Sequence, residues 1–174
     1  MKRFFTLSIL CLFVLTACGY STRSLLPARL DSIYIEPFEN DIDYTNEQKR
    51  TLYLPLLETQ VQENLIDRFL FDGNLRIAKT EDAALILRGK LLDYRRDDLR
   101  LDDNEDVQEY RISIIVSLEM FDVANDEVLW SETAFAGTAD YFLSGPHATS
   151  EDSAVDEALE DLARRVVART VENW

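Results

Sequence analysis

The strongest constraint on the fold is a strict alternation of side chains over residues 110–120. Successive side chains of a β-strand point to opposite faces of a sheet, so the alternation predicts a strand with one face on a hydrophobic core. Asn125 and Asp126 then mark a turn, and residues 128–138 are predicted to return as the second arm of a hairpin. The apolar face of the first arm is formed by Tyr110, Ile112, Ile114, Val116, Leu118 and Met120.

Other segments carry weaker strand patterns. Residues 32–36 alternate, which places Ile33 and Ile35 on one face of a first strand. A longer strand is predicted at 85–94, and a short strand is predicted at 75–79. One face of the longer strand is formed by Leu85, Leu87 and Leu91.

The first helix is predicted between residues 54 and 71, where apolar residues recur at helical spacing. Pro55 is tolerated only in a first turn, so we expect the helix to begin at Leu54 or Pro55. Gly73 supplies the stop signal. The predicted buried stripe is Leu54, Leu57, Val61, Leu65, Ile66, Phe69 and Leu70.

A second helix is predicted from a capping sequence at 149–152 to about residue 173. Its acidic residues come first and its arginines later, as the helix dipole favours. The predicted buried stripe is Val155, Leu159, Leu162, Val166 and Trp174.

These elements predict an α+β fold of two layers, in which two helices pack on one face of a mostly antiparallel sheet. The sheet has four strands, or five if residues 75–79 pair with it. Residues 31–174 are long enough for one domain with a substantial core. No internal repeat interrupts that organisation.

The N-terminal sequence indicates an export signal rather than a membrane-spanning helix. Lys2 and Arg3 precede an apolar run at 4–15, which is shorter than the roughly 20 residues that a spanning helix needs. Small residues and Cys18 follow, and this order resembles the bacterial lipobox, in which the cysteine receives diacylglycerol and an acyl chain after cleavage. We therefore expect a signal peptide at 1–17 and lipidation of Cys18; an ordinary signal peptide with an incidental cysteine is the alternative.

Cleavage leaves Cys18 as the only thiol, because Cys11 lies in the discarded core. Lipidation gives that thiol a use, and two or three chains anchor a protein stably to a bilayer. Residues 18–30, with no periodicity and with Pro27, are predicted to be a lipidated tether. Gly19 replaces the aspartate that favours inner-membrane retention in enterobacterial lipoproteins, so by resemblance the destination is the outer membrane.

The formal net charge is −15, and loss of Lys2 and Arg3 on cleavage makes it −17. Such a surface excludes binding to nucleic acid or anionic lipid by bulk electrostatics. His147 is the only histidine, and no nucleophile motif or phosphate-binding loop is present. We therefore predict no catalytic residues and no metal site. The acidic segment 97–106 is expected to be a solvated loop, with weak cation binding as the alternative.

One basic group stands out against this acidic background. Lys90, Arg95 and Arg96 flank the predicted end of a strand and are candidate ligands for phosphate or carboxylate. The alternative is that neighbouring acids, Asp93, Asp97 and Asp98, neutralise them.

Several segments together resemble one family: "CGY" after the lipobox, "SIYIEPFEN", "EDAALILRGKLLDYRR", "EYRISIIVSLEMFDVANDEVLWSE" and "LARRVVARTVENW". The chain is similar to LptE, the lipopolysaccharide-assembly lipoproteins. The resemblance implies a non-catalytic protein, held by Cys18 in the inner leaflet of the outer membrane. It would plug the LptD barrel, support the assembly of that barrel and assist lipopolysaccharide delivery to the cell surface.

Two alternatives remain open at this stage. One is another periplasm-facing outer-membrane lipoprotein, either an auxiliary transport subunit or an activator of peptidoglycan synthesis. The other is a hydrolase that uses carboxylates or a bound cation. The two lipoprotein hypotheses need no cofactor apart from the lipid on Cys18. Only the hydrolase hypothesis, in its cation-dependent form, requires one.

Overall fold

The computed structural model describes residues 26–45 and 52–172. The signal peptide, Cys18 and Trp174 therefore lie outside the described residues. Within the described ranges the elements are β1 (Ser32–Ile35), β2 (Glu39–Asn40), α2 (Leu57–Asp72), β3 (Arg76–Ile77), the short 3-10 helix η2 (Thr80–Asp82), β4 (Leu85–Leu101), β5 (Val107–Asp122), β6 (Glu127–Phe142) and α3 (Glu151–Glu172).

The α+β class is confirmed, but the predicted number of strands was wrong. The described strands form a six-stranded sheet in the order β3-β1-β4-β5-β6, with β2 beside β4, so the predicted count of four, or five with residues 75–79, is too low. The sheet is also mixed: β1 pairs in parallel with β3 and β4, whereas β4, β5 and β6 are antiparallel. The parallel pairing follows from α2, because a helical crossover returns the chain in its original direction.

β4 does not end near Tyr94, as the sequence suggested, but continues to Leu101. The prediction of a loop at 97–106 was therefore wrong for its first half, because Asp97 and Asp98 pair with β5. Only residues 102–106 form the turn. There the Asp102 carboxylate accepts the backbone N–H groups of Asn104 (2.8 Å) and Asp106 (3.0 Å).

The helices keep their predicted places with one shifted start. α2 begins at Leu57 rather than at residue 54 or 55, after Leu56 in the left-handed conformation (φ 59°). It ends at Gly73 (φ 74°), where glycine adopts the left-handed conformation without strain. α3 begins after Ser150, whose hydroxyl accepts the Ser153 N–H at 3.1 Å.

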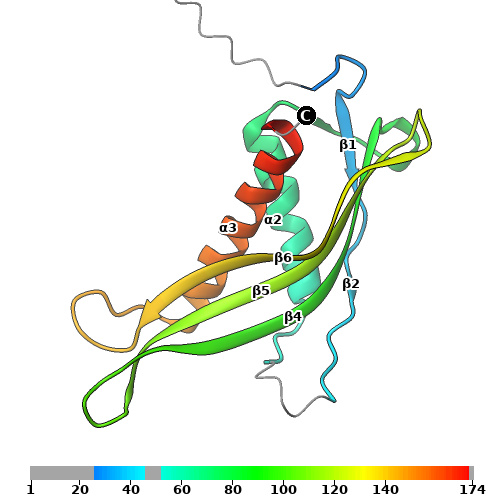
Figure 1. The fold of residues 1–174 in the computed structure, drawn as a ribbon. Coiled ribbons are helices and arrows are strands. Elements are labelled where there is room, and N and C mark those ends of the chain that lie inside the picture. The colour runs from blue at the N-terminus through cyan, green and yellow to red at the C-terminus, as the bar shows by residue number, and fades with distance from the viewer. Residues whose placement is uncertain (1–25, 46–51, 173–174) are drawn as a thin grey trace, which may run out of the picture.

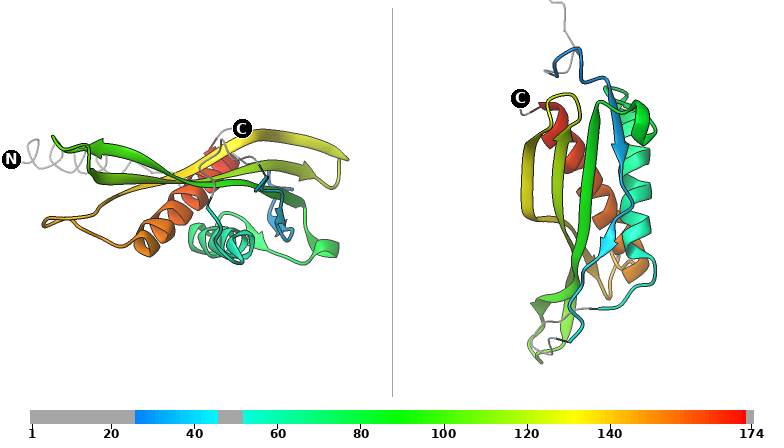
Figure 2. Two further views of the ribbon diagram at one scale, coloured as in Figure 1. Left: turned by 90° about the horizontal axis from the view of Figure 1, so that it is seen from below. Right: turned by 90° about the vertical axis from the view of Figure 1, so that its right-hand side faces the viewer.

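Both helices cover one face of the sheet, and among the described residues the other face carries no helix (Figure 2). Most of the predicted stripes are buried, including Phe69 on α2 and Leu159 on α3. Leu70 was wrongly placed in the stripe, since it is 59% exposed. No described helix is both long and apolar enough to cross a bilayer.

The molecule has two distinct ends (Figure 1). The β5–β6 end contains the turn between those strands, the first described residues and the C-terminal ends of both helices. The β4–β5 end contains the turn at 102–106 and the loop at 143–150, and it projects beyond both helices (Figure 2). A strand of 16 residues such as β5 spans roughly 50 Å, which is the distance scale between the two ends.

Candidate functional site

The three candidate basic residues lie along β4 and are all paired with carboxylates. Lys90 is on the uncovered face, where its Nζ lies 3.0 Å from Glu39 and 4.0 Å from Asp41. The hydrogen bond to Glu39 and the two negative charges raise the pKa of Lys90. Lys90 also borders a shallow hollow of about 400 Å³ between β2, β4, β5 and β6.

Arg95 lies in a similar setting farther along the strand. Its guanidinium is 3.0 Å from Asp97 and 3.9 Å from Asp93. These are two of the three acids that the sequence proposed as neutralising partners. Half of the Lys90 side chain and 43% of the Arg95 side chain remain exposed.

Arg96 lies apart from the other two, against the start of α3. Its Nη1 is 2.5 Å from Glu151 Oε2, and its guanidinium lies over the ring of Tyr110 at 4.6 Å. The hydroxyls of Tyr94 (3.2 Å) and Tyr141 (3.1 Å) also donate to Glu151. This Glu151 cluster fastens the first residue of α3 to β4 and β6.

Burial and the Glu151 charge raise the pKa of Tyr94 beyond its ordinary range. Burial likewise raises the pKa of Tyr141. For Arg96, burial acts to lower the pKa, but the hydrogen bonds to Glu151 and Tyr141 raise it further. Both tyrosines therefore stay protonated and donate to the Glu151 carboxylate, and these hydrogen bonds hold the start of α3 on the sheet.

The basic residues do not converge because β4 is irregular between Leu91 and Asp93. A bulge inserts a residue and changes which face the following side chains occupy. Sequence spacing alone puts Lys90 and Arg96 on the same face, whereas the bulge turns Arg96 toward the helices. No signal in the sequence marks this bulge.

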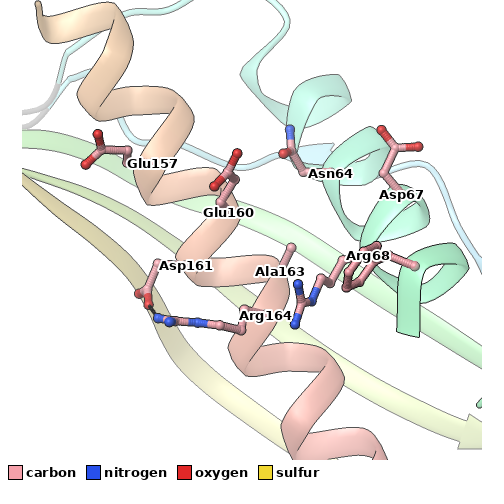
Figure 3. A pocket seen from close by; sticks show the side chains of 9 residues that line it. Asn64, Asp67, Arg68, Glu157, Glu160, Asp161, Ala163 and Arg164 are labelled. Atoms are coloured by element: carbon pink, nitrogen blue, oxygen red, sulfur yellow. Dashed lines mark hydrogen bonds and ion pairs between the residues drawn. The ribbon is translucent and has the colours of Figure 1, made fainter. Parts of the chain in front are cut away.

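A groove between α2 and α3, which the sequence analysis missed, has a volume of about 600 Å³ (Figure 3). Its walls carry more carboxylates than cations. Arg164 pairs with Asp161 on the same helix, and the Arg68 guanidinium lies over the ring of Phe71 at 5.3 Å. The groove is lined by Asn64, Asp67, Arg68, Phe71, Glu157, Glu160, Asp161, Ala163 and Arg164.

The β5–β6 end holds a buried carboxylate, Asp122, which sequence reasoning did not single out. Its side chain is 0% exposed and lies 2.5 Å from Arg29 Nη1. It also accepts the backbone N–H groups of Ala124 (3.1 Å) and Asn125 (3.3 Å). Burial raises the pKa of Asp122, but Arg29 and the backbone donors lower it by more, so the net pKa is below the usual value.

Arg29 belongs to the segment that the sequence assigned to the tether. With Leu30, which is 2% exposed, it is attached to the domain rather than held away from it. The incoming chain is therefore fixed at the β5–β6 end.

The hydrolase alternative called for carboxylates or a bound cation. No group of three or more His, Cys, Asp or Glu side chains there could hold a metal ion. His147 contacts the ring of Phe142, with 6.5 Å between ring centroids. The described part of the chain thus presents charged surfaces, a groove and structural ion pairs.

Comparisons with known proteins agree on the fold. The sequence model of the family LptE, described as lipopolysaccharide-assembly, matches residues 30–170. A search of curated protein sequences finds no match.

Solved structures with the same fold come from several bacteria. The PelC dodecamer of Paraburkholderia phytofirmans is 18% identical, with a TM-score of 0.51 over 86% of this chain and 96% of that chain. The protein XCC0632 from Xanthomonas campestris is 12% identical, with a TM-score of 0.58 over 83% and 88%. Lipoprotein B from Nitrosomonas europaea is 15% identical, with a TM-score of 0.53 over 84% of each chain.

Proposed function

Because the chain belongs to the LptE lipopolysaccharide-assembly family, we propose that it is a non-catalytic lipoprotein of the outer membrane. Cys18 carries the lipid anchor in the inner leaflet. The domain plugs an LptD-like barrel, supports its assembly and assists the delivery of lipopolysaccharide to the cell surface. The observation that carries this proposal is the family match, which spans every described strand, α2 and all of α3 except its last two residues.

The uncovered face of the sheet supports a plug. Arg111 makes two hydrogen bonds to Asp140, at 2.7 and 2.8 Å, and Arg88 lies 3.1 Å from Glu119. These cross-strand pairs give the face a polar character. The interior of a large membrane barrel is also polar, so such a face can enter it without placing apolar side chains in a polar environment.

The acidity of the domain suits a barrel with a basic lumen. Opposite potentials across an interface increase the association rate and select the partner. We propose that the β4–β5 end enters the lumen, because the incoming chain is fixed at the opposite end. The β5–β6 end then stays at the periplasmic mouth beside the membrane.

Direct contact with lipopolysaccharide is the finer part of the proposal. Lys90 and Arg95 are half-exposed and could exchange a carboxylate for a phosphate, whereas Arg96 is committed to Glu151. The variant Lys90→Ala/Arg95→Ala should weaken lipopolysaccharide binding at low salt, and Arg88→Ala serves as a control on the same strand. Unchanged binding in the double variant contradicts a direct role for these residues.

The main test is purification of the tagged, lipidated chain from outer membranes in mild detergent. We expect a stoichiometric, salt-resistant complex with a strand-rich membrane protein, and intact-mass analysis should show an acylated N-terminal Cys18. Cys18→Ala, which cannot be lipidated, is the matched control. A partnerless monomer contradicts the proposal, and recovery of a peptidoglycan synthase instead supports the alternative lipoprotein class.

A further inference from the structure

The β5–β6 end exposes apolar side chains that nothing in the described domain covers. Phe71 is 81% exposed and Leu70 is 59% exposed, and both lie in the last turn of α2. Val123 (42%) and Val128 (48%) flank the β5–β6 turn at the same end of the molecule (Figure 1). These four residues form two apolar points on one end of the domain.

The chain that leads to this end is short. Seven residues lie between Cys18 and Leu26, and even fully extended these eight Cα–Cα steps span about 28 Å. From Leu26 onward the chain is bound to the domain, through buried Leu30 and the ion pair between Arg29 and Asp122. An anchor at Cys18 therefore keeps the β5–β6 end near the bilayer, whereas the β4–β5 end lies farther away than the tether can reach.

The charged groups at this end match a headgroup that carries both signs. Arg68 forms no ion pair within the described residues, and its buried Nε has no hydrogen-bond partner there. It lies over Phe71, so a phosphate could bind it beside the apolar contact. Asp67 and Asp126 are exposed carboxylates that would repel an anionic surface, whereas the Asp72 carboxylate accepts hydrogen bonds from the backbone and side-chain amides of Asn74.

We propose that the β5–β6 end is a membrane-contacting surface, in which Leu70, Phe71, Val123 and Val128 enter the interface of a zwitterionic phospholipid bilayer. Arg68 binds lipid phosphate, and the neighbouring carboxylates face headgroup ammonium groups. This inference rests on the proposed lipidation of Cys18. It adds an orientation: the β5–β6 end lies at the inner-leaflet interface, and the β4–β5 end is the part of the domain farthest from the anchor.

The test uses the full lipidated chain in vesicles of phosphatidylcholine and phosphatidylethanolamine. The mature chain has no free thiol once Cys18 is acylated, so a single cysteine can carry a nitroxide label. Labels are placed through Phe71→Cys and Val128→Cys, with Leu101→Cys at the β4–β5 end as the matched control. Leu101 is also an exposed apolar residue, at 54%.

Collision with oxygen, relative to a water-soluble nickel complex, reports the depth of each label. We expect this ratio to be several-fold higher for the labels at 71 and 128 than for the label at 101. Equal, water-like ratios at all three positions overturn the inference. The measurement is repeated with the barrel protein in the vesicles. If the label at 71 then becomes inaccessible to both oxygen and the nickel complex, the inference is also overturned, because this end is then a protein interface.

Arg68→Gln tests the phosphate contact, with Arg164→Gln as the control because Arg164 already pairs with Asp161. The first variant should lower the depth ratio at position 128, and the second should leave it unchanged. Intact mass of each sample separates the two failures. An unlipidated Cys18 refutes the proposed anchor, whereas a lipidated chain with a water-exposed label at 71 refutes only the membrane-contacting surface.

Discussion

One carboxylate at each end of the molecule fastens another segment to the sheet. At the β5–β6 end that segment is the incoming chain, and at the β4–β5 end it is the start of α3. Asp122 at the β5–β6 end is fully buried and binds Arg29 from the incoming chain. Glu151 at the β4–β5 end is one-third exposed and binds Arg96 and two tyrosine hydroxyls, which fixes the start of α3. The first tie determines where the tether leaves the domain, and the second determines how the helix layer sits on the sheet.

The largest expected effect separates the helix layer from the sheet. At Gly137 a Cβ would lie 2.3 Å from the backbone oxygen of Ala158 and 2.5 Å from Leu162 Cβ. Gly137→Ala should therefore lower the free energy of unfolding by about 3 kcal/mol, since overpacking forces α3 away from β6. Hydrogen exchange should show faster exchange in α3 and near Glu151, with the Asp122 turn still protected.

Gly89→Ala is the control for this change. Its Cβ would meet only the ring of Phe38, within 2.2 Å, and a side chain can move more easily than a helix backbone. A smaller loss of stability is expected in urea unfolding. If Gly89→Ala costs as much as Gly137→Ala, the close approach of α3 to β6 is not what holds the helix layer.

The next largest effect is expected when the ion pair between Arg29 and Asp122 at the β5–β6 end is removed. Asp122→Asn keeps the size of the side chain but removes the charge that Arg29 binds, and it should cost about 2 kcal/mol because the group is buried. Residues 26–30 should then exchange amide hydrogens faster. Asp126→Asn, on the exposed part of the same turn, should be near neutral, and comparable losses in both variants would contradict the role of Asp122.

A smaller effect is expected when the Glu151 interactions at the β4–β5 end are weakened. Glu151→Gln removes the partner of Arg96 but retains an acceptor for one tyrosine, so we expect a cost of about 1 kcal/mol. Asp152→Asn in the next position is the control. Urea unfolding measures this loss, and equal losses in Glu151→Gln and Asp152→Asn would contradict the role of the Glu151 cluster.

The smallest effect is a difference in acid stability. The pKa of Asp122 is lower in the folded protein than in the unfolded chain, so its contribution is complete above the unfolded value and is lost as pH falls through the folded value. The wild type should lose more stability than Asp122→Asn below about pH 4. Urea unfolding at pH 6 and pH 3 measures this, and parallel losses in both proteins would remove Asp122 as the titrating group.

Regular periodicity predicted most of the fold. Most of the alternating apolar face at 110–120 and the middle of the α2 stripe, from Leu57 to Phe69, are buried as expected, because each element extends over several turns or several pairs of residues. The two-residue strands β2 and β3 are too short to carry a pattern. Asp97 and Asp98 were assigned to a loop because their charge outweighed the strand pattern, yet β5 places Arg111 opposite Asp97.

The candidate site was less accessible from the sequence. Glu151 meets Tyr94 from 57 positions away, and only the folded sheet brings them together. Asp122 looked like an ordinary turn residue, since nothing in the sequence shows that Arg29 reaches it. The opposing orientations of Lys90 and Arg96 depend on a bulge, which has no sequence signal comparable to a glycine or proline.

The most direct test of the account is photo-crosslinking in living cells, with a photoreactive amino acid at Leu101 in one strain and at Phe71 in another. We predict that position 101 crosslinks to the barrel protein and that position 71 crosslinks to phospholipid. A barrel adduct from position 71 with none from position 101 would reverse the proposed orientation. The absence of a barrel adduct from both positions, in chains shown to be lipidated, would contradict the central claim that this domain is a barrel-associated lipoprotein.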